Sequence, residues 1–447
     1  MAMIDRRAAL LAGVTLVAAC TTTAQRIGGR APSRFVTVDG LGFRRGGESY
    51  RYVGANIWYG AWLGADTAYG NRARLGRELD RLQALGVRNL RILGSAELSP
   101  LKNSITPGFR DATATYNQDL LQGLDWTLAE MAKRDMTAVI YLTNFWEWSA
   151  GMMTYLSWVN GGRYIDMNDP AHPWPQFADW NADFYTSGKA QAMYRDYIRA
   201  VVSRTNSVTG VAYAADPTIM AWQLANEPRA GGSDAVAVPN LPNFYRWVDE
   251  TARYIKTLDP NHLVSTGSEG LKGSIEREEV VLATHRAPSI DYLTTHIWPN
   301  NWEWMDAGNL AGTYDAGAAK VAAYIATHIG LARQLGKPLV IEEFGYPRDG
   351  QHAYDPSIGT VYKDRFYRQI YAAIEADMTA GGPIAGSNFW AWNGEARTPH
   401  ADHRFQRGDL GYMGDPPHEP QGWYGVFDSD AATQAIIRAH AAAVAAL

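Results

Sequence analysis

The sequence predicts an α/β domain with the (β/α)8 (TIM) barrel fold, and three observations support this prediction. Eight short apolar runs follow one another along the chain from residue 34 onward. Amphipathic stretches, with apolar residues three or four positions apart, lie between most of these runs. The connection after the first run is not the Gly-rich phosphate loop that a doubly wound sheet would carry. Eight repeats of strand and helix are therefore best explained by a closed barrel.

The expected elements follow in order along the chain. Residues 35–51 are interpreted as a small β-hairpin that closes the lower end of the barrel. The eight barrel strands are expected at residues 52–55, 90–93, 138–142, 219–224, 263–266, 292–295, 339–341 and 384–389. Helical spacing is clear at residues 79–85, 120–131, 194–201 and 248–258, and the last helix is expected at residues 430–445. Because neither a linker nor an internal repeat follows residue 33 in the sequence, residues 34–447 are predicted to form one catalytic domain.

The first 33 residues are expected to lie outside this domain. Arg6-Arg7 precedes a short apolar stretch that ends at Cys20, a pattern typical of a twin-arginine export signal in residues 1–20. The residues before Cys20 resemble a bacterial lipoprotein box, so Cys20 is predicted to be lipidated; a plain signal peptide is the alternative. Residues 21–33 are interpreted as a linker. We therefore expect an exported protein, either secreted or anchored as a periplasmic or cell-surface lipoprotein, which meets a membrane only through that anchor.

The composition limits the possible classes of function. The chain has 447 residues, of which 46% are hydrophobic and 19% charged, and its formal net charge is −5. It contains no dense run of Lys and Arg, so the sequence gives no electrostatic basis for nucleic-acid binding. Cys20 is the only cysteine, which excludes an intrachain disulfide and a cysteine-based metal site. The 16 Trp and 24 Tyr residues suit both a large core and a groove in which rings pack on sugars. A monomer without metal or other cofactor is expected.

Two long connections are expected on the C-terminal face of the barrel, where loops build the site in this fold. Residues 143–187 follow the third strand, and residues 390–429 follow the eighth. Loops of this length in a compact domain are usually functional. The second connection contains His400, Asp402 and His403, which could be read as a metal site, but a solvated loop is the preferred interpretation.

Two glutamates are the basis of the functional prediction. Glu227 is expected to close the fourth strand and Glu343 the seventh. A buried carboxylate at a strand end is costly and calls for a reason. These strands lie on opposite sides of a barrel mouth, so the two side chains can face each other across a bound sugar. The pair predicts a retaining glycoside hydrolase, which needs two carboxyl groups about 5 Å apart. Because side chains alternate along a strand, Glu342 is expected to point away from Glu343 into the barrel wall.

Four further residues are expected to support this pair. Arg91, in the second strand, is predicted to point into the barrel mouth, where its charge would keep Glu343 ionised. Asn226 is suited to hold the 2-hydroxyl of the sugar. His296 ends the sixth strand within reach of the carboxylates, and Trp390 ends the eighth as a platform for the sugar ring. The alternatives are structural: a salt bridge for Arg91, a neutral core histidine for His296 and barrel packing for Trp390.

Several motifs in order along the chain resemble those of glycoside hydrolase family 5, most closely its mannanase branch. They lie at residues 53–59, 144–158, 216–229, 296–302, 343–345 and 422–430, and the stretch 216–229 is the most specific. The resemblance covers nearly the whole mature chain. It implies a (β/α)8 retaining hydrolase in which Glu227 is the acid/base and Glu343 the nucleophile. It also implies substrate-binding roles for Arg91, Asn226, His296, Trp298, Trp390, Arg229, Trp146 and Trp302, with Arg229 on the leaving-group side.

One position departs from the family pattern. The family usually has a tyrosine, hydrogen-bonded to the nucleophile, two residues after the histidine; this chain has Trp298 there. An indole N–H can also donate, but its reach differs from that of a phenol. The substitution therefore bears on two properties: the hydrogen bonding that adjusts Glu343 as a nucleophile, and the choice of substrate.

The predicted reaction is the cleavage of β-1,4 linkages in mannan or manno-oligosaccharides by double displacement, as an endo-1,4-β-mannanase. An exo-β-mannosidase and an endo-β-1,4-glucanase of the same family are the alternatives within hydrolases. A carbohydrate-binding lipoprotein without activity is the alternative from another class. Residues 397–421, rich in charges and histidines, would produce an exo mode if they closed one end of the groove.

Overall fold

Eight parallel strands form the centre of the molecule, which is a computed structural model describing residues 34–306 and 308–447. Their order in the sheet is β8-β7-β6-β5-β4-β11-β10-β9. The strands are β4 Tyr52–Asn56, β5 Asn89–Leu93, β6 Thr137–Tyr141, β7 Ile219–Gln223, β8 Leu263–Ser265, β9 Leu293–Ile297, β10 Leu339–Phe344 and β11 Ile384–Phe389. Each coincides with one of the eight predicted runs, so the predicted (β/α)8 barrel is confirmed.

The two end strands of this order, β8 and β9, meet through hydrogen bonds just outside a regular ladder. The backbone N–H of Asp291 donates to the carbonyl oxygen of Val264 over 2.8 Å, and the Asp291 carboxylate accepts the Val264 N–H over 2.6 Å. Nearer to the C-terminal end of β9, the N–H of His296 donates to the carbonyl oxygen of Glu269 over 3.1 Å. These bonds bring the sixth strand beside the fifth and complete the barrel.

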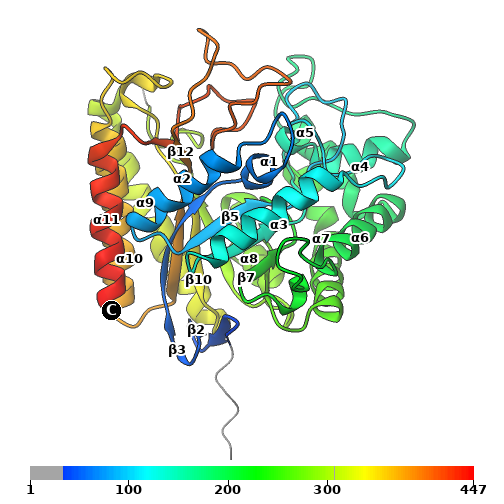
Figure 1. Ribbon diagram of the computed structural model, residues 1–447, viewed down its shortest axis with the longest axis horizontal. Coiled ribbons are helices and arrows are strands. Elements are labelled where there is room, and N and C mark those ends of the chain that lie inside the picture. Colours follow the sequence, from blue (N-terminus) through cyan, green and yellow to red (C-terminus); the bar gives the residue numbers. More distant parts are fainter. Residues whose placement is uncertain (1–33, 307) are drawn as a thin grey trace, which may run out of the picture. The chain divides into compact units, whose positions relative to one another are not determined.

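One long helix follows each strand and covers the outside of the barrel (Figure 1). These helices are α2 Arg72–Ala84, α3 Gln118–Ala132, α6 Gly188–Val202, α7 Asp234–Leu258, α8 Glu278–His285, α9 Leu310–Leu335, α10 Val361–Thr379 and α11 Ala431–Ala446. The side chains of Asn71, Asn117 and Ser187 accept backbone N–H groups in the first turns of α2, α3 and α6, which satisfies donors that a helix start leaves free. The helical stretches predicted from apolar spacing coincide, to within one residue, with parts of α2, α3, α6, α7 and α11.

The lower end of the barrel is closed by a three-stranded antiparallel sheet of β1 Thr37–Asp39, β2 Gly42–Arg45 and β3 Glu48–Tyr50. The predicted hairpin therefore has one more strand than expected. Phe43 and Tyr50 of this sheet are buried against a group of barrel residues that includes Tyr292 and Val340. In Figure 1 the segment after β11 rises at the end opposite to β2 and β3, so the site-forming loops lie at the other end of the barrel.

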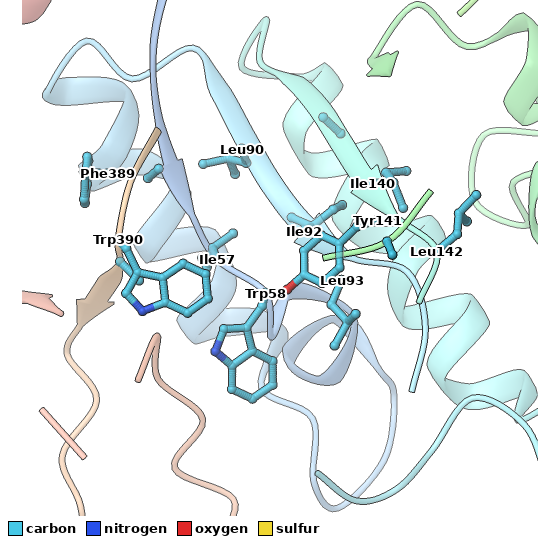
Figure 2. Close-up of a cluster of buried hydrophobic side chains, with 14 of the residues drawn as sticks. Ile57, Trp58, Leu90, Ile92, Leu93, Ile140, Tyr141, Leu142, Phe389 and Trp390 are labelled. Atoms are coloured by element: carbon cyan, nitrogen blue, oxygen red, sulfur yellow. The ribbon is translucent and has the colours of Figure 1, made fainter. Parts of the chain in front are cut away.

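The apolar core fills the layer between the strands and the surrounding helices. Figure 2 shows part of it, with Ile57, Leu90, Ile92, Ile140 and Phe389 coming from neighbouring strands or their ends. All five are fully buried. Burial of large apolar side chains contributes about 1.5–3 kcal/mol each, which fixes the strands in register and hence the positions of the residues at their ends.

Both long connections contain secondary structure. The connection after β6 includes α4 Gly151–Val159 and α5 Gln176–Asn181, and the connection after β11 includes the short strands β12 Trp392–Gly394 and β13 Val426–Phe427. The buried Asp415 carboxylate organises the second connection by accepting the backbone N–H groups of Gly422, Tyr424 and Gly425. The loop is therefore held by internal hydrogen bonds.

The predicted export signal, Cys20 and the linker of residues 21–33 lie outside the described residues. Within residues 34–306 and 308–447, none of the helices has both the length and the apolar character needed to span a bilayer. The predicted lipidation of Cys20 stays a prediction.

Candidate active site

The two predicted glutamates meet at the C-terminal mouth of the barrel. Glu343 lies within β10, as expected. Glu227 lies four positions past the end of β7, so the prediction that it closes the fourth strand is wrong in detail. The chain turns away there, since Glu227 adopts φ +50° and its N–H donates to the carbonyl oxygen of Gly267 over 2.9 Å. One oxygen of Glu227 and one of Glu343 lie within 4.8 Å of each other and of a ring nitrogen of His296.

Arg91 is fully buried at the centre of β5 and connects several of the predicted residues. Its guanidinium forms an ion pair with Oε1 of Glu343 and donates to Oδ1 of Asn226 over 2.7 Å. It also donates to Oε1 of Gln223 over 2.8 Å. The face of the Tyr141 ring lies 4.5 Å from its Cζ. A planar cation with five donors can satisfy this many partners at once, which a lysine could not.

Glu342 does not point into the barrel wall, and this prediction is wrong. Its two oxygens accept the Nε2 amide of Gln223 over 2.7 and 2.6 Å, and one lies 3.4 Å from Nε of Arg91. The physical reason is a break in the pairing of β10 with β9, where the register shifts between Ile341 and Glu343. Strict alternation fails at such a bulge, so two consecutive glutamates both face the barrel interior.

His296 lies between the carboxylates. Its Nδ1 atom is 2.6 Å from Oε1 of Glu227 and 3.3 Å from Oε2 of Glu343. On the other side of the ring, Nε2 is 3.7 Å from Oε2 of Glu342. Burial alone would lower the pKa of His296, but the three carboxylates raise it to about 10. The neutral core histidine that was the alternative interpretation is therefore disfavoured.

The surroundings shift the pKa values of the two glutamates in opposite directions. Burial raises the pKa of Glu343 to about 7, against the lowering effect of His296 and Arg91. Burial also works to raise the pKa of Glu227, but the hydrogen bond and charge of His296, together with Arg229, outweigh it and hold this pKa below the usual range. Arg91 lowers the pKa of Glu343 as expected, but burial and the charges of Glu227 and Glu342 outweigh its effect and favour protonation of Glu343.

A cavity of about 880 Å³ opens above this network. Eight of the predicted site residues line it: Trp146, Asn226, Glu227, Arg229, Trp298, Trp302, Glu343 and Trp390. Arg91 and His296 are fully buried and contact the glutamates that line it. Figure 2 shows the Trp390 side chain at the end of β11. Its ring lies edge-on to the rings of Trp148 and Trp298, at 6.5 and 5.9 Å between centroids. The cavity therefore combines carboxylates with flat aromatic walls.

The side of the cavity next to Glu227 is built around Arg229. Its guanidinium lies over the rings of Trp146 and Trp174, at 5.0 and 5.6 Å, and is paired with Glu269 at 2.5 Å. The indole N–H of Trp146 donates to Oε2 of Glu227. This gives Glu227 a second donor besides His296.

Trp298 packs against other rings in the cavity wall. Its ring lies edge-on to Tyr424 at 5.0 Å as well as to Trp390. In the part of the chain that the structure describes, no hydrogen bond joins its indole to Glu343. A Cβ added at Gly345 would lie 2.9 Å from the Trp298 ring, so the glycine leaves the space that this ring occupies.

The segment after β11 covers part of the cavity. Pro416, His418 and Glu419 line it. Burial raises the pKa of Glu419 well above its usual range, and burial lowers the pKa of His418 to about 4. His418 is therefore neutral near pH 7, and the environment of Glu419 favours its protonated form, which can donate as well as accept a hydrogen bond.

Two sets of residues contain side chains that could bind a metal ion. His400 bonds to Asp409 at 2.9 Å, and within the described ranges the one group of three ligands close enough to share an ion is Glu227, His296 and Glu343. Metal binding requires a neutral imidazole, whereas the carboxylates hold His296 protonated. Arg91 already supplies a cation to Glu343. The arrangement suits a proton shared among carboxylates better than it suits a metal ion.

Sequence reasoning missed several residues of this site. Gln223 and Glu342 belong to the network below the glutamates, and Glu269 pairs with Arg229. Glu269 follows β8 by four positions on the C-terminal face, and this spacing was a usable signal. His418 and Glu419 were noted only as loop charges, because sequence spacing does not show which part of a long loop folds back over the mouth.

A (β/α)8 barrel with two facing carboxyl groups, an arginine and a histidine beneath an aromatic cavity has the architecture of a glycoside hydrolase. The family model described as GH family 5 beta-mannosidase-like matches residues 33–447. The chain therefore belongs to glycoside hydrolase family 5.

Relatives and solved structures agree with this assignment. The chain is similar to mannan endo-1,4-beta-mannosidase 1 of Arabidopsis thaliana, with 29% identity over 80% of this chain and 81% of the relative. It is 30% identical to putative mannan endo-1,4-beta-mannosidase 9 of Oryza sativa subsp. japonica, over 80% and 82%. The family 5 mannosidase of Rhizomucor miehei superposes with a TM-score of 0.83 and 34% identity, covering 92% of this chain and 98% of that one. A variant of that protein has been solved in complex with mannosyl-fructose.

Proposed function

We propose that this chain hydrolyses β-mannosides with retention of configuration. The single observation that supports the reaction type is the pair Glu227 and Glu343, whose facing oxygens lie within 4.8 Å. Retaining enzymes need about 5–5.5 Å between the carboxyl groups, whereas inverting enzymes need about 6.5–9.5 Å to admit a water between them.

The proposed reaction has two steps. In the first, Glu343 attacks the anomeric carbon while Glu227 gives its proton to the leaving oxygen, so a glycosyl ester forms on Glu343 and the alcohol leaves. In the second, Glu227 takes a proton from water as that water attacks the anomeric carbon, and Glu343 leaves as carboxylate. Asn226 is fixed by Arg91 on its Oδ1, and its amide nitrogen, which donates to Oδ1 of Asn144 over 3.1 Å, has a further hydrogen for the 2-hydroxyl of the sugar.

The preference for mannose is proposed from the relatives. Those described above are named for mannan or as mannosidases, and one was captured with a mannosyl disaccharide. The proposed substrate is accordingly a β-linked manno-oligosaccharide, with β-1,4 linkage as in mannan. A β-1,4-glucan is the competing substrate within the family and is included in the test below.

Release of single mannose units from one chain end is the mode of action that we favour. Pro416, His418 and Glu419 line the cavity together with the two glutamates, and we propose that they limit the space for sugars on their side of the pair. Further lining residues come from the connections after β7 and β8, among them Gly231, Glu269 and Glu276. We propose that an aglycone of more than one sugar occupies that part of the cavity. The second candidate is the endo-mannanase predicted from the sequence, which is supported by the names of the plant relatives.

Product profiling tests the substrate and the mode together. Purified protein is incubated with mannohexaose and, separately, with cellohexaose, and products are followed by chromatography while the anomer formed first is read by NMR. Mannose and mannopentaose as the sole early products would support the exo mode. A spread of short oligomers would support the endo mode, and release of the α-anomer first would overturn retention.

We also propose that residues 1–20 direct export and that Cys20 is lipidated, which follows from the sequence pattern alone. A monomeric enzyme at the cell envelope would then act on oligosaccharides that reach it from outside. Expression of the full chain in a bacterium with labelled palmitate tests this: wild type should be labelled and Cys20→Ser should not. Equal labelling of both would overturn the proposal.

A further inference from the structure

Glu227 is contacted by hydrogen-bond donors on both of its oxygens. His296 lies at Oε1, and the indole N–H of Trp146 donates to Oε2. Trp146 comes from the connection after β6, so it reaches Glu227 from a different part of the barrel rim. Its contact is separate from the network of Arg91 and Gln223 below.

The Trp146 ring is fixed in place from several directions. Phe177 stacks on it at 11° between ring planes and 6.3 Å between centroids, and the guanidinium of Arg229 lies 5.0 Å from its centroid. Its backbone N–H donates to Oδ1 of Asn144 over 3.0 Å, and the same oxygen accepts the amide of Asn226 over 3.1 Å. The backbone of Trp146 and the side chain of Asn226, the residue before Glu227, are thus both bonded to the Asn144 side chain.

An indole N–H can donate a hydrogen bond but cannot accept one. A bond to a carboxylate is stronger than a bond to the neutral acid, because the acceptor carries charge. The contact therefore gains strength as the proton leaves Glu227, which is the event that general-acid catalysis requires. Loss of this donor would weaken the acid without removing it.

From this geometry we propose that Trp146 is a positioning residue that aims Glu227 at the leaving oxygen and strengthens it as an acid by stabilising its carboxylate. The proposal rests on the proposed function of Glu227. It assigns the effect to the indole N–H and not to the packing of the ring. Other charged or titratable groups that interact with Glu227 come from β5, β6, the connection after β8, β9, β10 and the segment after β11. They are Arg91, Tyr141, Glu269, His296, Glu343, His418 and Glu419, with Arg229 on its own connection.

The test compares Trp146→Phe with Trp148→Phe. Both change one cavity-lining indole to a phenyl ring, but Trp148 packs on Trp58 and Trp390, and within the described residues no hydrogen bond joins it to Glu227. Each variant is assayed on mannobiose, whose leaving group needs a proton, and on 2,4-dinitrophenyl β-mannoside, whose leaving group does not. We expect Trp146→Phe to lose about tenfold in kcat/KM on mannobiose and much less on the aryl mannoside.

The pH profile gives a second readout that altered packing would not move. Removing a donor from the Glu227 carboxylate raises its pKa, so the acid limb of kcat/KM should move to higher pH in Trp146→Phe and stay in place in Trp148→Phe. Equal losses on both substrates together with an unmoved acid limb would overturn the proposal. If Trp146→Phe does not fold, 3-benzothienylalanine at position 146 keeps the ring shape and replaces N–H by sulfur. A wild-type chain inactive on both substrates would instead refute the proposed function.

Discussion

The Nδ1 atom of His296 lies 2.6 Å from Oε1 of Glu227, and the same atom is 3.3 Å from Oε2 of Glu343. One imidazolium therefore bridges the two carboxyl groups proposed for catalysis. Three carboxyl groups, Glu227, Glu342 and Glu343, share two cations, His296 and Arg91, in a buried network. One negative charge is left over, so the network readily takes up one proton near neutral pH. General-acid catalysis needs that proton.

The first prediction concerns the dependence of activity on pH. Catalysis needs one proton on the pair Glu227 and Glu343. The state with this proton on Glu227 and the state with it on Glu343 have the same total charge, so the ratio of these two states does not change with pH. With the pKa of Glu343 raised to about 7, the pair loses this proton above about pH 7 and activity falls. With the pKa of Glu227 lowered, the second proton is added only below the usual range of glutamate, and activity falls there too. A profile of kcat/KM against pH should be bell-shaped with these limits; activity still rising at pH 8 would contradict it.

The second prediction separates the two glutamates by their roles. Glu227→Gln and Glu343→Gln should each reduce hydrolysis of manno-oligosaccharides by at least about 10³-fold while oligosaccharide binding persists, since the amides keep the shape of the site. Azide should restore turnover of 2,4-dinitrophenyl β-mannoside by Glu227→Ala with a β-mannosyl azide product, because azide needs no general base. With Glu343→Ala, azide should give the α-anomer instead. The reverse pattern would exchange the two roles, and near-wild-type activity of either glutamine variant would refute the pair.

The sequence predicts the strands of this fold better than it predicts the loops. The eight barrel strands are short apolar runs whose burial on both faces leaves little alternative, so their positions are predictable. The same logic misplaced Glu342, because a β-bulge is a local fit between two strands and has no signature in the apolar pattern. It also extended the fourth strand to Glu227, whose φ of +50° depends on a bond to Gly267 from another connection.

The site shows the same limit. Arg91, His296 and Glu343 lie within barrel strands, so their meeting follows once the strand order is known. Glu419 lies 30 positions beyond β11, in a connection whose path is set by the hydrogen bonds of the buried Asp415. A path of this kind depends on many weak contacts between distant residues. The residues that we propose to set the length of substrate are therefore the ones that sequence spacing could not find.

The third prediction concerns those residues. Glu419→Ala should open the cavity beside the glutamates, because it removes a carboxyl that lines the cavity, can bond to sugar hydroxyls and obstructs further sugars. We expect KM for mannobiose to rise several-fold and mannobiose to appear among the early products from mannohexaose. Glu419→Gln, which keeps size and both kinds of hydrogen bond, is the matched control and should retain release of mannose. An unchanged product pattern in Glu419→Ala would show that this side chain does not limit the substrate.

The last prediction tests whether Trp298 acts through its position in the cavity wall. Gly345 has ordinary backbone angles for a residue with a side chain, but a Cβ there would lie 2.9 Å from Cζ3 of Trp298 and 3.0 Å from the carbonyl oxygen of Trp390. Gly345→Ala should therefore push the Trp298 ring into the cavity, lower kcat/KM about tenfold and reduce the free energy of unfolding by about 1–3 kcal/mol.

A double-mutant cycle shows whether the effect passes through this ring. In a Trp298→Phe background, where the ring is smaller, Gly345→Ala should cost much less in both kcat/KM and thermal unfolding, since the clash is relieved. Gly330→Ala is the control, because a Cβ at that helical position of α9 meets open space and should leave kcat/KM unchanged while slightly raising stability. If Gly345→Ala costs the same with and without the indole, its effect comes from the contact with the Trp390 backbone, and Trp298 is not held by this glycine.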